Sequence, residues 1–503
     1  MSPALALPSG PLAAIDLGSN SFRLEIGQIA QGRYRRIRYL KEMVRLGAGL
    51  DESGRLGEDA SERGLACLGR FAEALAGLPG ERVRAVATAT LREAHNRDDF
   101  TRRAQALLGL PVEVISGREE ARLIHAGVSF LQPSSRRRLI VDIGGRSTEL
   151  VLCTGRQLHR AESFPVGSVS LSLAYFADGQ LTARAFRQAQ VAAGAALEEA
   201  LCAFTPDLWD EALGSSGTAG AVSDALAAAR ITDGTVTLEG LRQLIDRCLE
   251  AGHVSRLALP GIKPERHAVL PGGLAILYTL AAQFGIPELR PAKGALRQGV
   301  IVDLRDRLRA AASQGSAAQD LRDTTVAALR QRFHACAAQA ERVRQHAAAL
   351  FEQLAPDSPL EARRELGWAA QLHEIGMAVS HGDHHRHGAY LMTHLDADGF
   401  SRPQQQRLGW LVHGQRGGLR KLGEALADPV LARQLLSLRL AVIACHARDE
   451  VDPDALRLRP RQQQVRLGVP DGWAETHPRT LHLLREEAAL WARSASQIGR
   501  AHV

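Results

Sequence analysis

The chain has 503 residues, 45% of them hydrophobic, and a formal net charge of +7. This length is too great for one hydrophobic core and predicts roughly three or four domains. No apolar run reaches the roughly 18 residues of a membrane-spanning helix, which excludes that class of membrane protein. The excess of cationic side chains favours a polyanionic ligand.

The cysteines and the N-terminus indicate a reducing compartment. The six cysteines are scattered and form no CxxC pair, which fits reduced thiols in a cytoplasm and disfavours a disulfide framework. The first residues, MSPALALPSGPLAA, precede any basic residue and make a poor secretory signal. We therefore expect a cytoplasmic protein.

A first hairpin is predicted over residues 12–30. The stretch AAIDLGSNSFRLEI at 13–26 has apolar residues on both sides of a turn that follows Asp16. Glycine in such a turn lets a phosphate approach the backbone, and successive N–H groups form a nest for an anion. Ser19 and Asn20, which lie in this turn, are candidate phosphate-binding residues.

The next stretch predicts an edge strand, a helix and two further strands. The arginines at 33–38 alternate with other residues as on a solvated edge strand, and residues 60–78 have helical spacing. Val83–Ala87 and Val112–Ile115 are apolar, β-branched runs that predict strands. Ser116 would then cap a helix.

The end of the strand at 83–87 carries hydroxyls and a cation. Thr88, Thr90 and Arg92 follow it in the sequence. In α/β folds, ligands often bind where strands end. Arg92 is therefore a candidate phosphate ligand; the alternative is an ion pair with Glu93 or Asp98.

The helix after residue 116 contains two adjacent glutamates. With about 100° per residue, Arg122, His125 and Ser129 share a polar face of this helix. Glu120 falls on the opposite, apolar side, whereas Glu119 lies nearer the border. A carboxylate on the packed side is partly desolvated, which raises its pKa towards the range of a general base. The alternative is a buried carboxylate that the free N–H groups of the first helical turn satisfy.

The stretch LIVDIGGRSTELVL at 139–152 repeats the first hairpin. At an offset of 126 residues, the difference between 142 and 16, Asp142 matches Asp16 and Gly144 matches Gly18. The repeat predicts a duplicated hairpin, with two turns that hold a phosphate from both sides of a cleft; the alternative is a chance similarity of two turns. The candidate phosphate-binding residues of the second turn are Gly144, Gly145, Arg146 and Ser147.

Three carboxylates beside the two turns suit a metal ion. Asp142 ends a strand, Glu149 follows the turn, and Asp16 is the counterpart of Asp142. Carboxylate oxygens are the hard ligands that Mg²⁺ prefers. We predict Asp142 and Glu149, together with Asp16, as Mg²⁺ ligands.

Two later stretches also combine glycine with a helix start. Residues 182–204 predict an Ala-rich helix, and Gly214–Thr218 open the next one. The free N–H groups and the positive dipole end of a helix attract phosphate, which makes Ser216, Gly217 and Thr218 binding candidates; the alternative is a simple N-cap. His267–Leu270 before two glycines predicts another strand, glycine turn and helix. This alternation predicts two α/β subdomains that flank a cleft.

The sequence changes character after the stretch AASQGSAAQ, which predicts a linker at 309–319. Beyond it the pattern is mostly helical, and histidines gather at positions 373, 381, 384, 385, 387 and 394. HD-type phosphohydrolases bind metals through His–Asp pairs, but here His373 precedes Glu374, and Cys445-His446-Ala447-Arg448 contains no aspartate. We interpret these histidines as structural or phosphate-facing. Near the C-terminus, Arg457, Arg459 and Arg461 alternate as on a strand.

Several motifs resemble one phosphatase family. They are the two hairpins, SGREEARLIHAG at 116–127, GSSGTAGAV at 214–222, LPGGLAIL at 270–277, ALRQG at 295–299 and the C-terminal HEIG…HRHGAY. Together they resemble the exopolyphosphatase and guanosine pentaphosphate phosphohydrolase (Ppx/GppA) family of the actin–sugar kinase–Hsp70 superfold. The family has a third glycine where this chain has Arg146, so that Arg146 either clamps a phosphate or points to solvent.

The resemblance implies a fold class and a domain order. The N-terminal half is expected to be α/β, with two actin-like (ASKHA, ribonuclease H-like) subdomains around a cleft. A mostly α-helical HD-like domain and a small appended terminal domain would follow. The four expected domains are 1–121, 122–308, 318–447 and 448–503.

The resemblance also implies an activity. It indicates a Mg²⁺-dependent exopolyphosphatase that hydrolyses the terminal phosphate of inorganic polyphosphate, with Glu120 activating the water. A homodimer is expected, with no nucleic acid required and no membrane span. Guanosine pentaphosphate is the alternative substrate, because the family shares its motifs between both activities. A kinase or ATPase of the same superfold, or a polyphosphate-binding module, would differ in nucleotide affinity and in phosphate release.

Overall fold

The computed structural model describes residues 10–312, 320–449, 451–461, 464–493 and 499–502. The chain forms two compact units that divide between residues 318 and 319. In the predicted linker, residues 309–312 belong to the last helix of the first unit, and 313–319 lie outside the described residues, as does the N-terminal stretch 1–9. No described helix is both long enough and apolar enough to cross a membrane.

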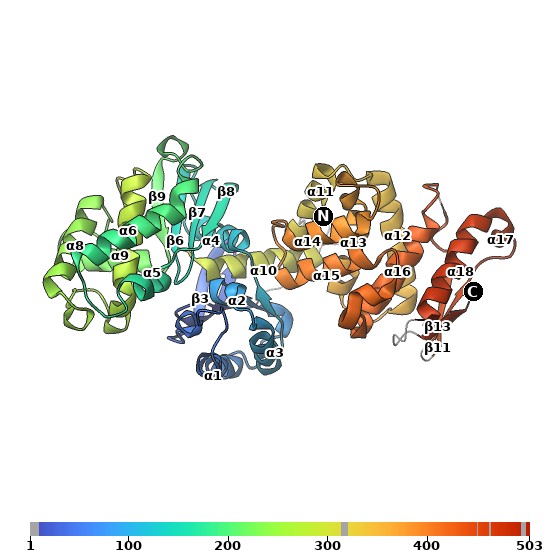
Figure 1. The fold of residues 1–503 in the computed structure, drawn as a ribbon, viewed down its shortest axis with the longest axis horizontal. Coiled ribbons are helices and arrows are strands. Elements are labelled where there is room, and N and C mark those ends of the chain that lie inside the picture. Colours follow the sequence, from blue (N-terminus) through green and yellow to red (C-terminus); the bar gives the residue numbers. More distant parts are fainter. Residues whose placement is uncertain (1–9, 313–319, 450, 462–463, 494–498, 503) are drawn as a thin grey trace. The chain divides into compact units, whose positions relative to one another are not determined.

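The first sheet has the strand order β3-β2-β1-β4-β5; its edge strand β3 is labelled in Figure 1. β1, β2 and β3 are antiparallel neighbours, and β4 and β5 continue the sheet in parallel. β3 is the exposed edge strand that the alternating arginines predicted. The bounds are β1 (Leu12–Leu17), β2 (Phe22–Ala30), β3 (Arg33–Glu42), β4 (Val83–Ala87), β5 (Val112–Val114), α1 (Glu58–Ala74), α2 (Ala89–Glu93) and α3 (Arg97–Leu108).

The second sheet repeats this topology, with the order β10-β9-β6-β7-β8. β6, β7 and β8 are antiparallel neighbours, and β9 and β10 extend the sheet in parallel from β6. The bounds are β6 (Arg137–Ile143), β7 (Thr148–Thr154), β8 (Gln157–Phe164), β9 (Glu211–Ser215), β10 (Leu289–Pro291), α5 (Ser168–Tyr175), α6 (Ala183–Leu197), α7 (Ser216–Ala228), α8 (Leu238–Ala251) and α9 (Leu270–Gln283). The predicted fold class, two actin-like α/β subdomains and a mostly helical C-terminal half, is confirmed.

The central strands of the two sheets are buried on both faces. Side chains of a strand alternate between faces. In β1, Ile15 belongs to the core formed with α1 and α3, whereas Ala14 joins a core shared with the second sheet. In β6, Val141 belongs to the core formed with α6 and α9, whereas Ile140 joins the same shared core. The shared core therefore ties the two sheets together.

Two helices, α4 (Gly117–Leu131) and α10 (Leu296–Ala312), fill this shared core. Their backbones meet at glycines. A β-carbon on Gly299 of α10 would overlap the carbonyl oxygen of Leu123 in α4, and one on Gly127 would overlap that of Ala295. The two helices therefore touch without intervening side chains.

The strand predicted at His267–Leu270 was wrong. Pro264–Val269 form a 3-10 helix, η6, and both following glycines lie inside α9. A short apolar run cannot distinguish a buried strand from a buried helix, and α9 is apolar on most of its surface. A β-carbon on Gly273 would lie 2.6 Å from Cγ2 of Thr218, so the glycine permits close packing against α7.

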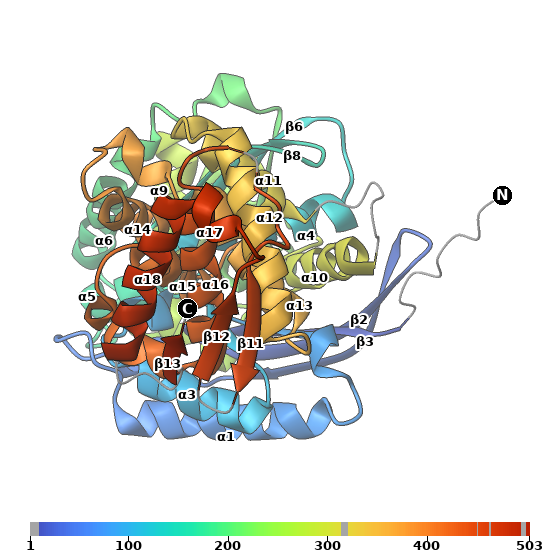
Figure 2. The same cartoon turned by 90° about the vertical axis from the view of Figure 1, so that its right-hand side faces the viewer.

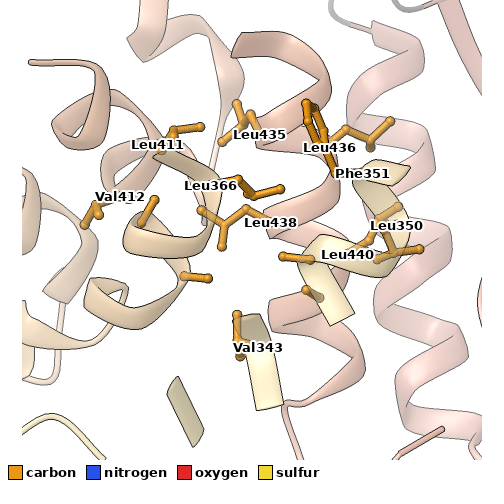
Figure 3. Close-up of a cluster of buried hydrophobic side chains, with 14 of the residues drawn as sticks. Val343, Leu350, Phe351, Leu366, Leu411, Val412, Leu435, Leu436, Leu438 and Leu440 are labelled. Atoms are coloured by element: carbon orange, nitrogen blue, oxygen red, sulfur yellow. The ribbon is translucent and has the colours of Figure 1, made fainter. Parts of the chain in front are cut away.

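The second unit is a helical bundle with a small sheet. The core of the bundle contains Leu350, Leu366, Val412 and Leu438, from four different helices (Figure 3). The helices are α11 (Leu321–Arg332), α12 (Ala337–Leu354), α13 (Leu360–Leu372), α14 (His384–His394), α15 (Arg402–Gly414), α16 (Pro429–Ala444), α17 (Trp473–Thr476) and α18 (Pro478–Arg493). The strands β11 (Arg457–Arg461), β12 (Gln464–Gly468) and β13 (Gly499–His502) lie beside α18 (Figure 2).

Candidate active site

Two four-residue turns connect the hairpins β1–β2 and β6–β7 in the same register. Asp16 lies opposite Arg23 in the first hairpin, and Asp142 lies opposite Glu149 in the second. The local geometry also repeats: a β-carbon on Gly18 would lie 3.0 Å from the carbonyl oxygen of Ser21, and one on Gly144 would lie 3.1 Å from that of Ser147. The repeat in the sequence thus corresponds to a repeat in the structure.

The two turns meet at one cavity. A β-carbon on Gly145 would lie 2.9 Å from Cβ of Ser19, so the turns touch. The cavity has a volume of about 90 Å³, in a measure by which one water takes about 10–15 Å³. Most predicted site residues line it, namely Asp16, Ser19, Asn20, Glu120, Asp142, Gly144, Gly145, Ser147, Ser216, Gly217 and Thr218.

Three predicted site residues are not part of this lining. Arg92 donates from Nη1 to Oε2 of Glu120 at 3.0 Å and to the carbonyl of Ile115 at 3.0 Å. Arg146 forms an ion pair with Glu93. Glu149 accepts a hydrogen bond from the hydroxyl of Ser163 at 2.8 Å, and its other carboxylate oxygen is buried without a partner.

The structure adds three arginines to the lining that were not predicted: Arg23, Arg266 and Arg297. The offset of 126 residues would have indicated Arg23, because it is the counterpart of Glu149. Arg297 lies in the ALRQG motif, and nothing in the sequence indicated Arg266. Gly18, Ser21, Thr88 and Ser168 also line the cavity.

These arginines make specific contacts. Arg23 and Arg297 each donate from Nη1 to Oδ2 of Asp16 at 3.4 Å. Arg266 donates to the carbonyl of Gly217 at 2.6 Å. Asp16 is therefore held between two guanidinium groups, and a third covers the start of α7.

Glu120 is presented by the first turn of α4. The hydroxyl of Ser116 accepts a hydrogen bond from the N–H of Glu119 at 3.1 Å, as the predicted cap requires. Burial raises the pKa of Glu120 to about 7; Arg92 opposes this rise, and the negative charges of Asp142 and Asp16 add to it. Glu120 thus has the protonation behaviour of a general base near neutral pH.

The helical-wheel argument misplaced Glu119. Glu119 is 1% exposed and Glu120 is 8% exposed, so Glu119 is the more deeply buried of the two. The supposed polar face packs inside the unit, where Arg122 donates to both carboxylate oxygens of Glu119. A helical-wheel projection of α4 cannot show that this charged face is buried, because Asp303, which accepts from Arg122, lies on α10, far along the chain.

Buried carboxylates gather on one wall of the cavity. Burial raises the pKa of Asp142 above its ordinary value, and Asp16 adds to the effect. Burial also raises the pKa of Glu149, with Glu120 and Asp142 adding to it. Glu120 pairs with Arg92, and Asp16 pairs with Arg23 and Arg297, but Asp142 and Glu149 form no ion pair with a described cation and so lack a compensating positive charge.

A divalent cation would supply that charge. No group of three or more His, Cys, Asp or Glu among the described residues is arranged to hold a metal ion by itself. Mg²⁺ is often bound by one or two carboxylates, with waters and substrate phosphates completing its shell. Asp142, and Glu149 with its unpartnered oxygen, fit that kind of site. Asp16 fits it less well, because two arginines already contact it.

Cations gather at another part of the cavity. Burial lowers the pKa of Lys41 to about 8, and the charges of Arg266, Arg23 and Lys263 lower it further. Of these four residues, Arg23 and Arg266 line the cavity, and Lys41 and Lys263 are near enough to add positive charge to theirs. The arrangement suits a ligand with several negative charges.

Comparison with known proteins gives consistent matches. A family model described as the Ppx/GppA phosphatase family matches residues 26–308, and one for domain III of these phosphatases matches residues 321–488. A solved Aquifex aeolicus PPX-GPPA enzyme is 28% identical, with a TM-score of 0.50 over 59% of this chain and 99% of that chain. A solved exopolyphosphatase-like protein is 26% identical, with a TM-score of 0.54 over 60% of this chain and 99% of that chain. An exopolyphosphatase from Cytophaga hutchinsonii, 23% identical with a TM-score of 0.53 over 59% of this chain and 98% of that chain, shares the fold.

Proposed function

Because the chain belongs to the Ppx/GppA phosphatase family, we propose that it is an exopolyphosphatase that hydrolyses the terminal phosphate of inorganic polyphosphate. The observation that carries this proposal is that buried carboxylates, among them Asp142 and Glu120, and the guanidinium groups of Arg23, Arg266 and Arg297 line one cavity, with the charge of Lys41 close to that of Arg23 and Arg266. A chain of phosphates needs both a reacting centre and cations for the phosphates that follow the terminal one.

In this proposal Glu120 accepts a proton from the attacking water. Its Oε2 is held by Arg92, which leaves Oε1 for the water. The turns at 18–21 and 144–147 bind the terminal phosphate through backbone N–H groups, which stabilise charge that develops on the phosphate oxygens. The N–H of Gly144 is not one of them, because it donates to the carbonyl of Ser147 within the turn.

The start of α7 is the third binding element. The hydroxyls of Ser216 and Thr218 both donate to the carbonyl of Ile143, at 2.9 and 3.0 Å, and so fix α7 against the second hairpin. The first N–H groups of a helix have no partner within the helix and attract an anion. The two hydroxyls therefore position this turn, and its backbone binds the phosphate.

Phosphatases of this family generally depend on a divalent cation. We propose that Asp142 and Glu149 hold it, with Mg²⁺ as the ion. When bound, it neutralises phosphate charge that would otherwise repel an incoming water.

The lining favours the inorganic chain over guanosine pentaphosphate. None of the described residues that line the cavity is aromatic. Aromatic side chains supply much of the stacking energy that proteins use to bind nucleobases. Polyphosphate needs no such contact, because the cationic cluster can bind phosphate after phosphate.

A direct comparison of substrates tests this proposal. We expect faster phosphate release, as kcat/KM, from long polyphosphate than from guanosine pentaphosphate, and little release from either without Mg²⁺. A higher kcat/KM for guanosine pentaphosphate would contradict the preference and favour the second activity. Tight ATP binding without phosphate release from either substrate would reject the phosphatase proposal itself.

The pH dependence of the reaction tests the role of Glu120. Below its pKa of about 7 the carboxyl is protonated and cannot accept a proton, so kcat/KM should fall as the pH is lowered. A bound divalent cation favours the ionised form and would move the midpoint below about 7. Initial rates of phosphate release from about pH 5 to about pH 9, at constant ionic strength, give the profile. A rate that does not change with pH over this range would contradict the assignment.

A further inference from the structure

Arg146, in the second turn, reaches across to the first half of the unit. Its Nε lies 2.8 Å and its Nη2 2.6 Å from Oε2 of Glu93, and its Nη1 donates to the carbonyl of Gly47 at 3.2 Å. The side chain of Arg146 is 21% exposed and that of Glu93 is 40% exposed. The contact therefore joins the second hairpin to the end of α2 and to the 3-10 turn η1 (Leu46–Gly49).

Both ends of this contact adjoin the cavity. The N–H of Gly47 donates to the carbonyl of Ser19 at 2.7 Å, so η1 is bonded to the first turn. Gly145 beside Arg146 touches Ser19 directly. The chain of contacts is closed: first turn, η1, Arg146, second turn and back to the first turn.

The other partner, Glu93, belongs to an element with a second role. α2 follows β4 directly, and its start lines the cavity at Ala89. Arg92, one residue before Glu93, contacts Oε2 of Glu120. The Arg146–Glu93 pair thus connects the second turn to the element that holds Glu120.

These contacts give Arg146 a role other than the two that the sequence left open. We propose that Arg146 and Glu93 are positioning residues: their ion pair fixes the two phosphate-binding turns at the separation that one phosphate requires. The proposal rests on the proposed phosphatase function, because it assigns a purpose to the two turns. In this proposal Arg146 positions the turns and does not itself bind phosphate.

The expected effect is on catalysis more than on stability. An exposed ion pair contributes little to the free energy of unfolding. In contrast, a shift of about 1 Å in a group that orients the substrate costs up to about 100-fold in rate. Loss of the pair should therefore change the kinetics of a protein that remains folded.

A double-mutant cycle tests the proposal. The variants are Glu93→Gln, Arg146→Ala and the double variant, compared with the wild type by kcat and KM on tripolyphosphate and by thermal unfolding. We expect each single variant to lower kcat/KM by about 10- to 100-fold, through a lower kcat and a higher KM. The kcat/KM of the double variant should be no lower than that of the poorer single variant. Tm should change by no more than about 4 °C, and Arg146→Lys should recover part of the loss.

A matched control is Arg103→Ala. Arg103 also forms an exposed ion pair, with Glu58 at 2.7 Å, but it joins α3 to α1, and neither of these helices contributes a residue to the lining of the cavity. This variant should keep wild-type kinetics. Its result separates the loss of this particular pair from the loss of any surface pair.

Two results would overturn the proposal. A loss of activity in Arg146→Ala, with activity kept or improved in Glu93→Gln, would show that Arg146 binds phosphate directly. Unchanged kinetics in all three variants would show that the pair has no role. If polyphosphate is not the substrate, the wild type itself will release no phosphate from it. The double-mutant cycle would then be measured on guanosine pentaphosphate. The rise in Tm that each ligand causes serves as a second readout.

Discussion

Glu120→Gln is expected to lower kcat by roughly 10²–10⁴-fold, with little change in KM or in Tm. Glutamine has the same shape but cannot accept the proton of the attacking water. Glu120 is buried among carboxylates that raise its pKa, so a neutral side chain removes repulsion at this place. Arg92 loses an ionised partner but is part-exposed and still donates to the carbonyl of Ile115. The measurement is steady-state phosphate release together with thermal unfolding.

The adjacent Glu119→Gln is the matched control. It is the same substitution one residue away, at a carboxylate bound by Arg122 and 3.9 Å from Arg84. We expect it to lower the free energy of unfolding, since it leaves buried guanidinium groups without full compensation, while the folded fraction keeps its kcat. If Glu119→Gln lowered kcat more than Glu120→Gln, with both variants folded, Glu120 would not be the base.

Asp303→Asn is expected to lower the free energy of unfolding by about 3–5 kcal/mol. Asp303, on α10, is buried and contacts three arginines, Arg84 at 2.7 Å, Arg122 at 2.6 Å and Arg307 at 2.6 Å. Burial alone would raise the pKa of Asp303, but Arg307, Arg122 and Arg84 lower it well below its ordinary value. Asp303 is the carboxylate that all three cations contact; without its charge, only Glu113 and Glu119 of the described residues remain beside Arg84 and Arg122, and the cluster of three arginines carries an excess of positive charge. Denaturant unfolding gives the change.

The same group gives a dependence of stability on pH. Because the pKa of Asp303 is lower in the folded protein than in the unfolded chain, its contribution is fully present above the unfolded value of about 3.9 and is lost as the pH falls. Asp306→Asn on the same helix is the control, since Asp306 is part-exposed and pairs with Arg305, its sequence neighbour. If both substitutions lowered the free energy of unfolding equally, the buried network around Asp303 would stabilise the protein no more than the exposed Asp306–Arg305 pair does.

The features that could be predicted from the sequence are those that depend on residues close together in the chain. The two hairpins were predictable, because apolar runs around a glycine turn form locally and the repeat of Asp16 at Asp142 needs no tertiary information. The cap at Ser116 and the helix after it were predictable for the same reason. These local elements carry most of the residues that line the cavity.

The remainder depends on contacts between distant segments. Arg266 reaches the cavity from η6 and Arg297 from α10, and no local pattern shows where such side chains end. Arg92 and Arg146 were candidates for phosphate binding, with an ion pair and a solvent-facing side chain as the respective alternatives; the structure pairs them with Glu120 and Glu93, and the sequence did not indicate these partners together. Glu119 was misjudged because a charged helix face can be buried when another helix supplies opposite charges.

The glycine contact between α4 and α10 has a consequence for motion. Helices separated by side chains can slide past each other as those side chains change rotamer, whereas helices in backbone contact have no such freedom. Because a β-carbon at Gly127 or Gly299 would overlap backbone atoms across the contact, these two glycines hold α4 and α10 at backbone distance. Since α4 carries Glu120 and α10 carries Arg297, and both side chains line the cavity, this contact also limits how far the proposed base and this cation can move relative to each other.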